Sequence, residues 1–108
     1  MNRGDLVTVS VTGDHGKPRP AVVIQTNRTR TTASVLVCLC TSRIDQAAEY
    51  RLPITPTPHN GLLKASLVQG DKIHAITRDK CGPVIGKLTP TELADLDICL
   101  SLILGMTD

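Results

Sequence analysis

The most constraining feature of this sequence is the distribution of its apolar residues along the chain. From residue 5 to about residue 77, they fall in short runs rich in valine, isoleucine and threonine, and glycine and proline separate these runs. Such runs are typical of β-strands, because β-branched side chains fit the pleated surface of a sheet. A helical pattern occurs only near the end of the chain. The order of elements therefore predicts a mostly β protein of the α+β class, with a barrel-like sheet partly covered by one helix.

Three strands are predicted in the first 42 residues. Residues 5–11 alternate valine with leucine, threonine and serine, while 21–26 and 34–42 are largely apolar, which favours central positions in a sheet. Residues 13–20 are too rich in glycine and proline for regular structure and predict an exposed polar loop. Residues 27–32 are polar and basic, and they predict a second surface connection.

The middle of the chain is less well determined by its pattern. A fourth strand is expected at 50–55, where a proline favours an edge position or a bulge, and a turn is expected at 56–61. Residues 62–68 and 72–77 fit either two short strands or one long strand interrupted at Gly70. The sequence leaves this choice open.

The end of the chain predicts an amphipathic helix with clear boundaries. Thr89 is expected as the N-cap, Pro90 occupies the first helical position, and Glu92 completes a capping box. Gly105 is expected to end the helix in a left-handed conformation. The apolar residues that recur at helical spacing are Leu93, Leu96, Leu100, Ile103 and Leu104.

Length and composition predict one domain, spanning 1–108, with an aliphatic core. The sequence has one tyrosine, Tyr50, and no phenylalanine or tryptophan. A bound single-stranded nucleic acid would therefore find few aromatic surfaces for stacking. The charge is uneven. Residues 1–43 carry six basic and two acidic residues, whereas the remainder carries six basic and eight acidic ones. A basic N-terminal half favours a polyanionic partner.

Four cysteines occur, at Cys38, Cys40, Cys81 and Cys99. In a strand, Cys38 and Cys40 would lie on the same face. Their spacing lacks the CxxC pairs typical of zinc sites, so we expect buried free thiols, no metal and no cofactor. The chain begins with a charged, strand-like segment, and its apolar runs are too short to span a bilayer. We therefore expect a cytoplasmic protein that does not contact a membrane.

The basic loop before the second strand is the strongest candidate site. The sequence has no HExxH, GxSxG, P-loop or Rossmann glycine pattern, which disfavours metal-dependent and covalent hydrolases. Pro18 and Pro20 flank Arg19, so its guanidinium leaves a stiff segment, as a transition-state clamp requires. His15, in the same loop, is a candidate phosphate or base contact. The alternatives are a surface arginine between turn prolines and a solvated histidine.

Several segments, taken in order, resemble the MazF/PemK family of toxins. They are 3–9 (RGDLVTV), 17–25 (KPRPAVVIQ), the strand end 40–42 (CTS), 66–76 (SLVQGDKIHAI) and 85–88 (IGKL). The likeness covers nearly the whole chain. It implies an SH3-like small β-barrel with a C-terminal amphipathic helix, in a homodimer whose shared face binds single-stranded RNA such as mRNA. It also implies a cognate antitoxin, whose acidic, partly disordered segment would cover the basic groove.

The resemblance further implies a metal-independent endoribonuclease. In this family the RNA 2′-hydroxyl attacks the adjacent phosphorus, leaving a 2′,3′-cyclic phosphate and a free 5′-hydroxyl. Arg19 corresponds to the family's catalytic arginine and Thr41 to its catalytic threonine. The group that accepts the 2′-hydroxyl proton is left open. The further candidates for RNA contact are His15, Lys17, Arg28, Arg30, Ser42, Arg43 and Arg78. Relatives can stack bases on loop aromatics, which this chain has few of, so the basis of its sequence specificity is open.

Two alternative functions were weighed. The first is a CcdB-like protein that has the same fold and poisons DNA gyrase by binding alone. The matched arginine and threonine argue against it, because a pure binder needs no clamp aimed at phosphorus. The second is an inactive RNA-binding relative, which would retain RNA without cutting it.

Overall fold

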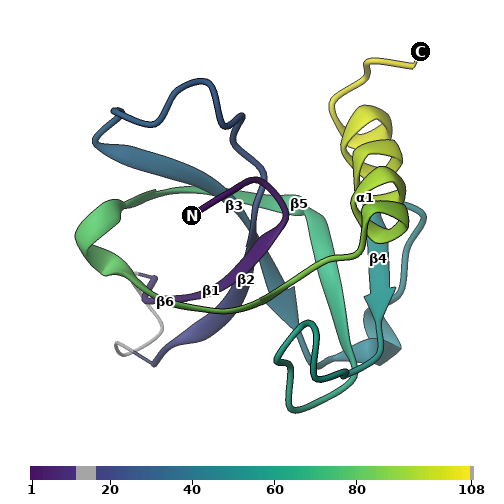
Figure 1. Ribbon diagram of the computed structural model, residues 1–108. Coiled ribbons are helices and arrows are strands. Elements are labelled where there is room, and N and C mark those ends of the chain that lie inside the picture. The colour runs from purple at the N-terminus through teal and green to yellow at the C-terminus, as the bar shows by residue number, and fades with distance from the viewer. Residues whose placement is uncertain (12–16, 108) are drawn as a thin grey trace.

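The computed structural model describes residues 1–11 and 17–107 and folds them around one antiparallel sheet (Figure 1). The strands in this part of the chain are β1 (Asp5–Val9), β2 (Arg19–Val23), β3 (Ser34–Thr41), β4 (Arg51–Ile54), β5 (Ser66–Thr77) and β6 (Cys81–Lys87). Two short 3-10 helices, η1 (Ile44–Gln46) and η2 (Arg78–Lys80), and the helix α1 (Pro90–Ile103) complete the fold. The mostly β architecture with one C-terminal α-helix is confirmed.

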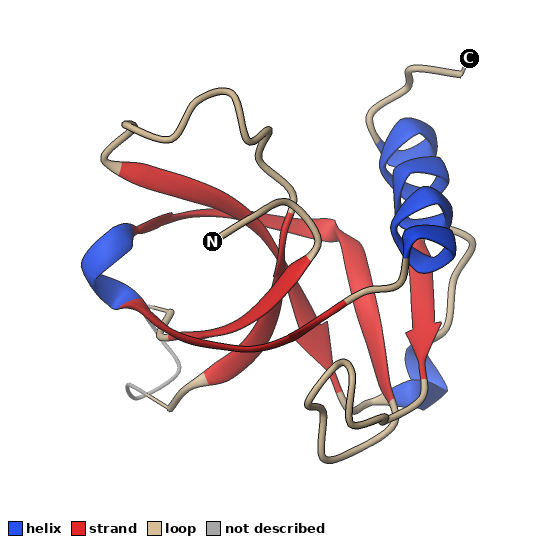
Figure 2. Ribbon diagram, in the orientation of Figure 1, coloured by secondary structure: helices blue, strands red, loops and turns tan. Residues whose placement is uncertain are grey.

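The sheet curves like a barrel without closing (Figure 2). Its strand order is β4-β5-β3-β2-β1-β6, so β4 and β6 are the edges. Of the edge position and the bulge that the proline in the fourth strand allowed, β4 takes the edge position. Alternating side chains divide the core into two apolar clusters on the two faces of the sheet. Val7, Val23 and Val37 belong to the cluster inside the curve, whereas Leu6 and Val22 face the other way, in the cluster that α1 joins.

The structure settles the role of Gly70, because β5 runs through it as one strand of 12 residues. The backbone of Tyr50, just before β4, lies beside β5 at this point, and the Gly70 N–H donates to the Tyr50 carbonyl oxygen over 3.0 Å. A Cβ on residue 70 would lie 2.5 Å from that oxygen, so only glycine permits the approach. The prediction of a strand at 62–68 was partly wrong, since 62–65 lie outside β5.

The strands β2 and β6 differ most from what the sequence predicted. β2 begins at Arg19, so Arg19 and Pro20 belong to a strand and not to a loop. Proline fits there because the ladder to β3 starts only at Ala21, which leaves β2 paired on one side at Pro20. β6 was missed altogether. Its sequence, CGPVIGK, carries turn residues, and as an exposed edge strand it shows no alternation of apolar and polar side chains.

The helix α1 begins as predicted, but its apolar face is shorter than expected. Thr89 and Glu92 form the capping box through bonds of 3.1 and 2.8 Å, and Gly105 has a φ of 72°. Ile103 and Leu104 are 41 % and 58 % exposed, so their expected place in the core was wrong. The final turn extends past the sheet, where nothing covers it within the described chain (Figure 1). No helix in residues 1–11 or 17–107 is long and apolar enough to cross a bilayer.

Candidate active site

Arg19 and Thr41 meet at one end of the sheet. β2 and β3 are antiparallel, with Ala21 opposite Leu39 and Val23 opposite Val37. Arg19 is the first residue of β2 and Thr41 is the last residue of β3, so antiparallel pairing puts both at the same end of the sheet. Both line a single groove with a volume of about 690 Å³.

The groove is lined by two chemically different sets of residues. One set comes from the ends of β2 and β3, where the cations and hydroxyls of Lys17, Ser42 and Arg43 join Arg19 and Thr41. The other set comes from the segment between β4 and β5 and from β6, and it adds the apolar Leu62, Leu63 and Ile85 together with the cation of Lys64. Three of the seven residues predicted to contact RNA, namely Lys17, Ser42 and Arg43, therefore share the groove with Arg19 and Thr41.

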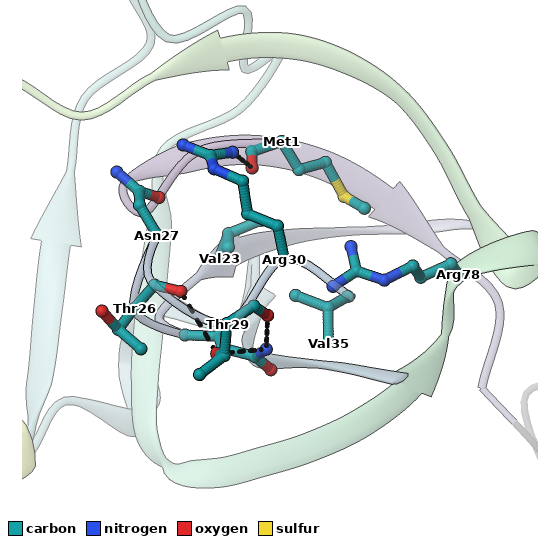
Figure 3. A pocket seen from close by; sticks show the side chains of 9 residues that line it. Met1, Val23, Thr26, Asn27, Thr29, Arg30, Val35 and Arg78 are labelled. Atoms are coloured by element: carbon teal, nitrogen blue, oxygen red, sulfur yellow. Dashed lines mark hydrogen bonds between the residues drawn. The ribbon is translucent and has the colours of Figure 1, made fainter. Parts of the chain in front are cut away.

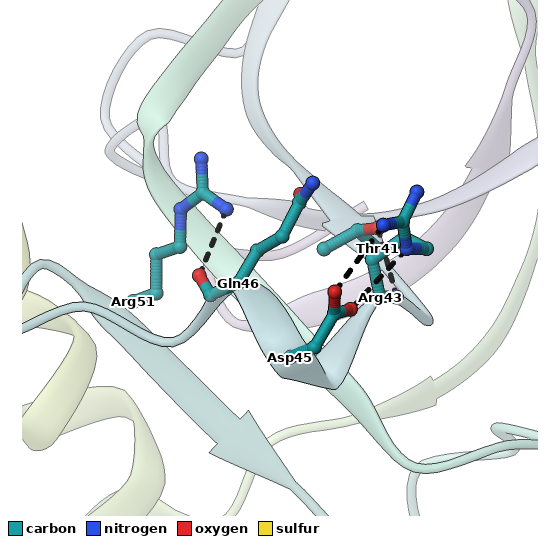
Figure 4. A network of polar contacts seen from close by, with 5 residues as sticks. All are labelled: Thr41, Arg43, Asp45, Gln46 and Arg51. Carbon is teal, nitrogen blue, oxygen red and sulfur yellow. Dashed lines mark hydrogen bonds and ion pairs between the residues drawn. The ribbon is translucent and has the colours of Figure 1, made fainter.

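The Thr41 hydroxyl is fixed by the turn that follows it (Figure 4). Its oxygen accepts a hydrogen bond of 3.1 Å from the backbone N–H of Arg43. A hydroxyl that accepts one bond can still donate its own hydrogen. The Arg43 guanidinium donates to both Asp45 carboxylate oxygens at 3.2 Å, and these bonds hold the Asp45 pKa below its ordinary value. Because this pair is exposed to solvent, another anion can compete with Asp45 for Arg43 at little cost.

A break in strand pairing behind Thr41 sets the direction of the end of β3. The pairing between β3 and β5 shifts between Cys38 and Cys40, so the residue between them, Leu39, lies where the ladder is irregular. Gln69 is 6 % exposed, and its side-chain amide donates to the Leu39 carbonyl oxygen over 3.2 Å. This bond satisfies a buried acceptor and holds the last residues of β3 in place.

Arg51 holds the connection from η1 to β4. Its guanidinium forms a two-pronged pair with the Asp71 carboxylate, at 3.0 and 2.9 Å, and it also donates to the Gln46 carbonyl oxygen at 3.1 Å (Figure 4). The side chains of Arg51 and Asp71 are 11 % and 21 % exposed. The hydrogen bonds from Arg51 lower the Asp71 pKa from its ordinary value of 3.8, because they stabilise the carboxylate form.

We expect Asp71→Asn to lower the free energy of unfolding by about 1.5–3 kcal/mol near pH 7, the worth of hydrogen bonds to a charged group. A lowered native pKa means that this stabilisation is present above the unfolded value and is lost as the pH falls through the native value. Denaturant unfolding of both proteins at descending pH should show the difference shrink below about pH 4. A difference that stays constant down to the acid limit would contradict this account.

The thiol that borders the groove is not suited to nucleophilic chemistry. Cys40 is 3 % exposed, and burial, with a smaller contribution from Cys38, raises its pKa to about 12. It therefore stays protonated near neutral pH. Cys38, Cys40 and Cys99 are buried free thiols as predicted, whereas Cys81 is only half-buried on the edge strand β6. Among the described residues, no group of three or more His, Cys, Asp or Glu side chains could hold a metal ion.

Three of the predicted RNA contacts lie at the other end of the same strands. Arg28 and Arg30 follow the last residue of β2, and Arg78 follows the end of β5, which pairs there with the start of β3. Arg30 and Arg78 point into a separate pocket of about 180 Å³ (Figure 3). The Arg30 guanidinium donates to the side chain of Asn2 and to the Met1 carbonyl oxygen, while that of Arg78 donates to Thr32. The structure does not bring these arginines to the groove, and their role stays a prediction.

One predicted residue cannot be placed, and Leu63 and Lys64 are among the lining residues that the sequence did not predict. His15 lies outside the described residues. Leu63 and Lys64 line the groove, although the pattern assigned them to the interior of a strand. The available signal was the Asn60-Gly61 pair, which is typical of a tight turn and indicates that the residues just after it can project from the surface.

The fold and the groove together define a class of protein: a small β domain with a cleft lined by cations and hydroxyls at the end of its sheet. Comparison with known sequences is more specific. Residues 2–104 match the family of PemK-like, MazF-like toxins of type II toxin–antitoxin systems, and the chain belongs to this family. A protein of Mycolicibacterium smegmatis named "Probable endoribonuclease MazF" is 36 % identical over 107 residues, covering 98 % of each chain.

Solved structures agree on the fold. A mycobacterial endoribonuclease, determined in complex with its cognate antitoxin, superposes with a TM-score of 0.83 at 20 % identity, covering 100 % of this chain and 98 % of that one. The Mycobacterium tuberculosis toxin MazF-mt6 gives 0.81 at 20 % identity, covering 94 % and 96 %. A MazE–MazF structure from Deinococcus radiodurans gives 0.76 at 24 % identity, covering 99 % and 97 %.

Proposed function

We propose that this protein is a toxin endoribonuclease that cleaves single-stranded RNA, with mRNA as its substrate in the cytoplasm. The observation that carries the proposal is the shared groove of Arg19 and Thr41. A chain 36 % identical along nearly its full length is named an endoribonuclease, which supports the same activity here.

The proposed reaction is an internal transesterification that needs no metal. The RNA 2′-oxygen forms a bond to the adjacent phosphorus, the bond from phosphorus to the 5′-oxygen breaks, and the 2′-hydroxyl proton is lost while the leaving oxygen gains one. The products are a 2′,3′-cyclic phosphate and a 5′-hydroxyl. Negative charge gathers on the nonbridging oxygens in the transition state. Stabilising that charge is the main task of the site.

Arg19 and Thr41 suit this task for different reasons. A guanidinium can donate two parallel hydrogen bonds to phosphate oxygens, and Pro18 and Pro20 restrict the backbone that carries Arg19. The Thr41 hydroxyl, whose oxygen already accepts from Arg43, can donate its hydrogen to the same phosphate. Lys17, Ser42 and Arg43 would hold neighbouring phosphates of the strand. For His15, Arg28, Arg30 and Arg78, we keep RNA contact as a proposal for nucleotides further along the strand.

We also propose a homodimer and a cognate antitoxin as partners. The mycobacterial endoribonuclease named above was determined in complex with its cognate antitoxin, and the Deinococcus structure is a MazE–MazF structure, which supports such a partner for this chain. An acidic antitoxin segment would compete with RNA for the cations of the groove. The homodimer rests on the family resemblance.

Incubation of the purified protein with a long defined RNA in excess EDTA tests the activity. We expect cleavage at discrete sites, with 5′-hydroxyl and cyclic phosphate ends, to survive metal removal. Cleavage that requires added Mg²⁺ would overturn the proposed mechanism. RNA that is bound but never cut would indicate the inactive relative, and RNA that is neither bound nor cut, together with inhibition of gyrase, would indicate a gyrase poison.

A further inference from the structure

We propose that Leu63 and Lys64 form a nucleotide-binding wall of the groove, in which Leu63 packs against a base and Lys64 holds a backbone phosphate. This inference rests on the proposed function. It concerns the residues that position the RNA substrate and select the RNA sequence that is cut. Leu63 and Lys64 face the groove from the segment between β4 and β5, whereas Arg19 and Thr41 come from the ends of β2 and β3. We call this pair of residues the Leu63–Lys64 wall.

The turn that carries the wall is built around a buried asparagine. Asn60 is 1 % exposed. Its side-chain oxygen accepts from the backbone N–H groups of Thr57 and Leu62, both at 3.0 Å, and its amide donates to the Thr55 carbonyl oxygen at 2.9 Å. One side chain thus bonds three backbone groups across the turn. Because these bonds already restrict the turn, it loses little conformational entropy when it binds a ligand.

The same turn is tied to the opposite edge of the sheet. The Lys87 N–H of β6 donates to the His59 carbonyl oxygen over 3.1 Å. Gly61 adopts a φ of 71°, and a Cβ there would lie 2.0 Å from the Ile85 carbonyl oxygen. These contacts span the gap between the two edge strands, β4 and β6. The position of the Leu63–Lys64 wall is therefore fixed by contacts between its turn and the sheet.

Leu63 and Lys64 project from this fixed base. Leu62, just before them, is 7 % exposed and anchored in the core, and the Ser66 hydroxyl, just after them, donates to the Lys64 carbonyl oxygen over 2.9 Å. Leu63 itself is 95 % exposed. A single exposed leucine on a surface is ordinary. Leu63 differs because it lies between the buried Leu62 and Ser66 and lines a groove that contains cations, so its exposed side chain is positioned to contact a ligand there.

The chemistry of a nucleotide matches the two sets of residues that line the groove. A base presents a flat apolar face and a phosphate presents negative charge, while the groove is lined by the apolar Leu62, Leu63 and Ile85 as well as by Arg19 and Thr41. Proteins that bind single strands combine a positive track with apolar stacking surfaces, which are usually aromatic. With one Tyr and no Phe or Trp, this chain would use an aliphatic surface in that role.

Cleavage of a long defined RNA by Leu63→Ala tests the base contact. We expect a loss of about tenfold in kcat/KM at the preferred sites, equivalent to roughly 1.4 kcal/mol of lost apolar contact, and a broader distribution of cut sites. Leu63→Phe should retain a restricted set of sites, because it keeps an apolar face. The matched control is Ile98→Ala, which removes an apolar side chain that is 67 % exposed on α1 and should change neither readout.

Binding of an RNA lacking 2′-hydroxyls, which cannot be cut by transesterification, tests Lys64. We expect Lys64→Ala to bind all RNA sequences more weakly. The slope of its binding constant against salt concentration should fall by about one phosphate contact. The matched control is Lys80→Ala on η2. Suppose that the wild type cuts RNA, that Leu63→Ala keeps the wild-type rate and cut sites, and that Lys64→Ala keeps the wild-type salt slope. This result would overturn the role of the Leu63–Lys64 wall and leave the proposed function standing. Wild type that cuts no RNA would overturn the proposed function. In that case, the binding measurement decides whether the wall still holds nucleic acid.

Discussion

Arg19→Ala is expected to lower kcat/KM for RNA cleavage by at least about 100-fold, or about 2.7 kcal/mol of transition-state stabilisation, the worth of one oxyanion-hole donor. The guanidinium is expected to act on charge that develops in the transition state, so binding of an uncleavable RNA should fall much less than the rate. Single-turnover cleavage of a defined RNA, measured beside wild type, provides the comparison.

Arg19→Lys separates charge from geometry in the same assay. It keeps the positive charge but cannot donate two parallel bonds, so its rate should lie between those of wild type and Arg19→Ala. Thr41→Val, of nearly equal shape, should also slow cleavage. If both groups act on one phosphate, the double variant should lose less than the sum of the single losses. A loss below tenfold in Arg19→Ala, or strict additivity with Thr41→Val, would count against the assigned roles.

Gly61→Ala is expected to cost about 3 kcal/mol of folding free energy. An alanine at a φ of 71° is strained by about 1–2 kcal/mol, and its Cβ would stand 2.0 Å from the Ile85 carbonyl oxygen, so backbone must move on one side or the other. The movement would displace the Leu63–Lys64 wall. Thermal or denaturant unfolding gives the change in stability. RNA cleavage by the fraction that remains folded shows whether the Leu63–Lys64 wall has been displaced.

Ala65→Gly is a suitable comparison for Gly61→Ala, because residue 65 is exposed in the same segment. We expect it to cost no more than about 1 kcal/mol, the entropy of one added glycine. An unfolding midpoint for Gly61→Ala equal to that of wild type would show that the turn does not pack against β6 as described.

Local patterns predicted the elements whose stability is decided by nearby residues. The capping box at Thr89 and Glu92 depends on residues three apart, so it could be read directly and is confirmed. The strand at 34–42 was equally clear, since its apolar run needs burial on both faces. The MazF/PemK resemblance added the candidate roles of Arg19 and Thr41, because its motifs follow the chain in order.

Other features depend on partners far away in the sequence. β6 exists because its edge pairs with β1, and its own residues carry turn signals. Ile103 and Leu104 continue the apolar spacing of α1, but the sheet ends before it can cover them. The arginines at positions 28, 30 and 78 were predicted to contact RNA together with Lys17, Ser42 and Arg43. Strand direction alone puts them at the opposite end of β2 and β3.

By itself, the sequence determined a mostly β domain with a capped C-terminal helix, a stiffened Arg19 and a hydroxyl at the end of the third strand. Tertiary structure decided that Arg19 and Thr41 share a groove, because antiparallel pairing puts the start of β2 and the end of β3 at the same end of the sheet. It also decided that Leu63 lines this groove. That placement depends on a buried Asn60 and on the close approach of β6, contacts between residues that no local pattern connects.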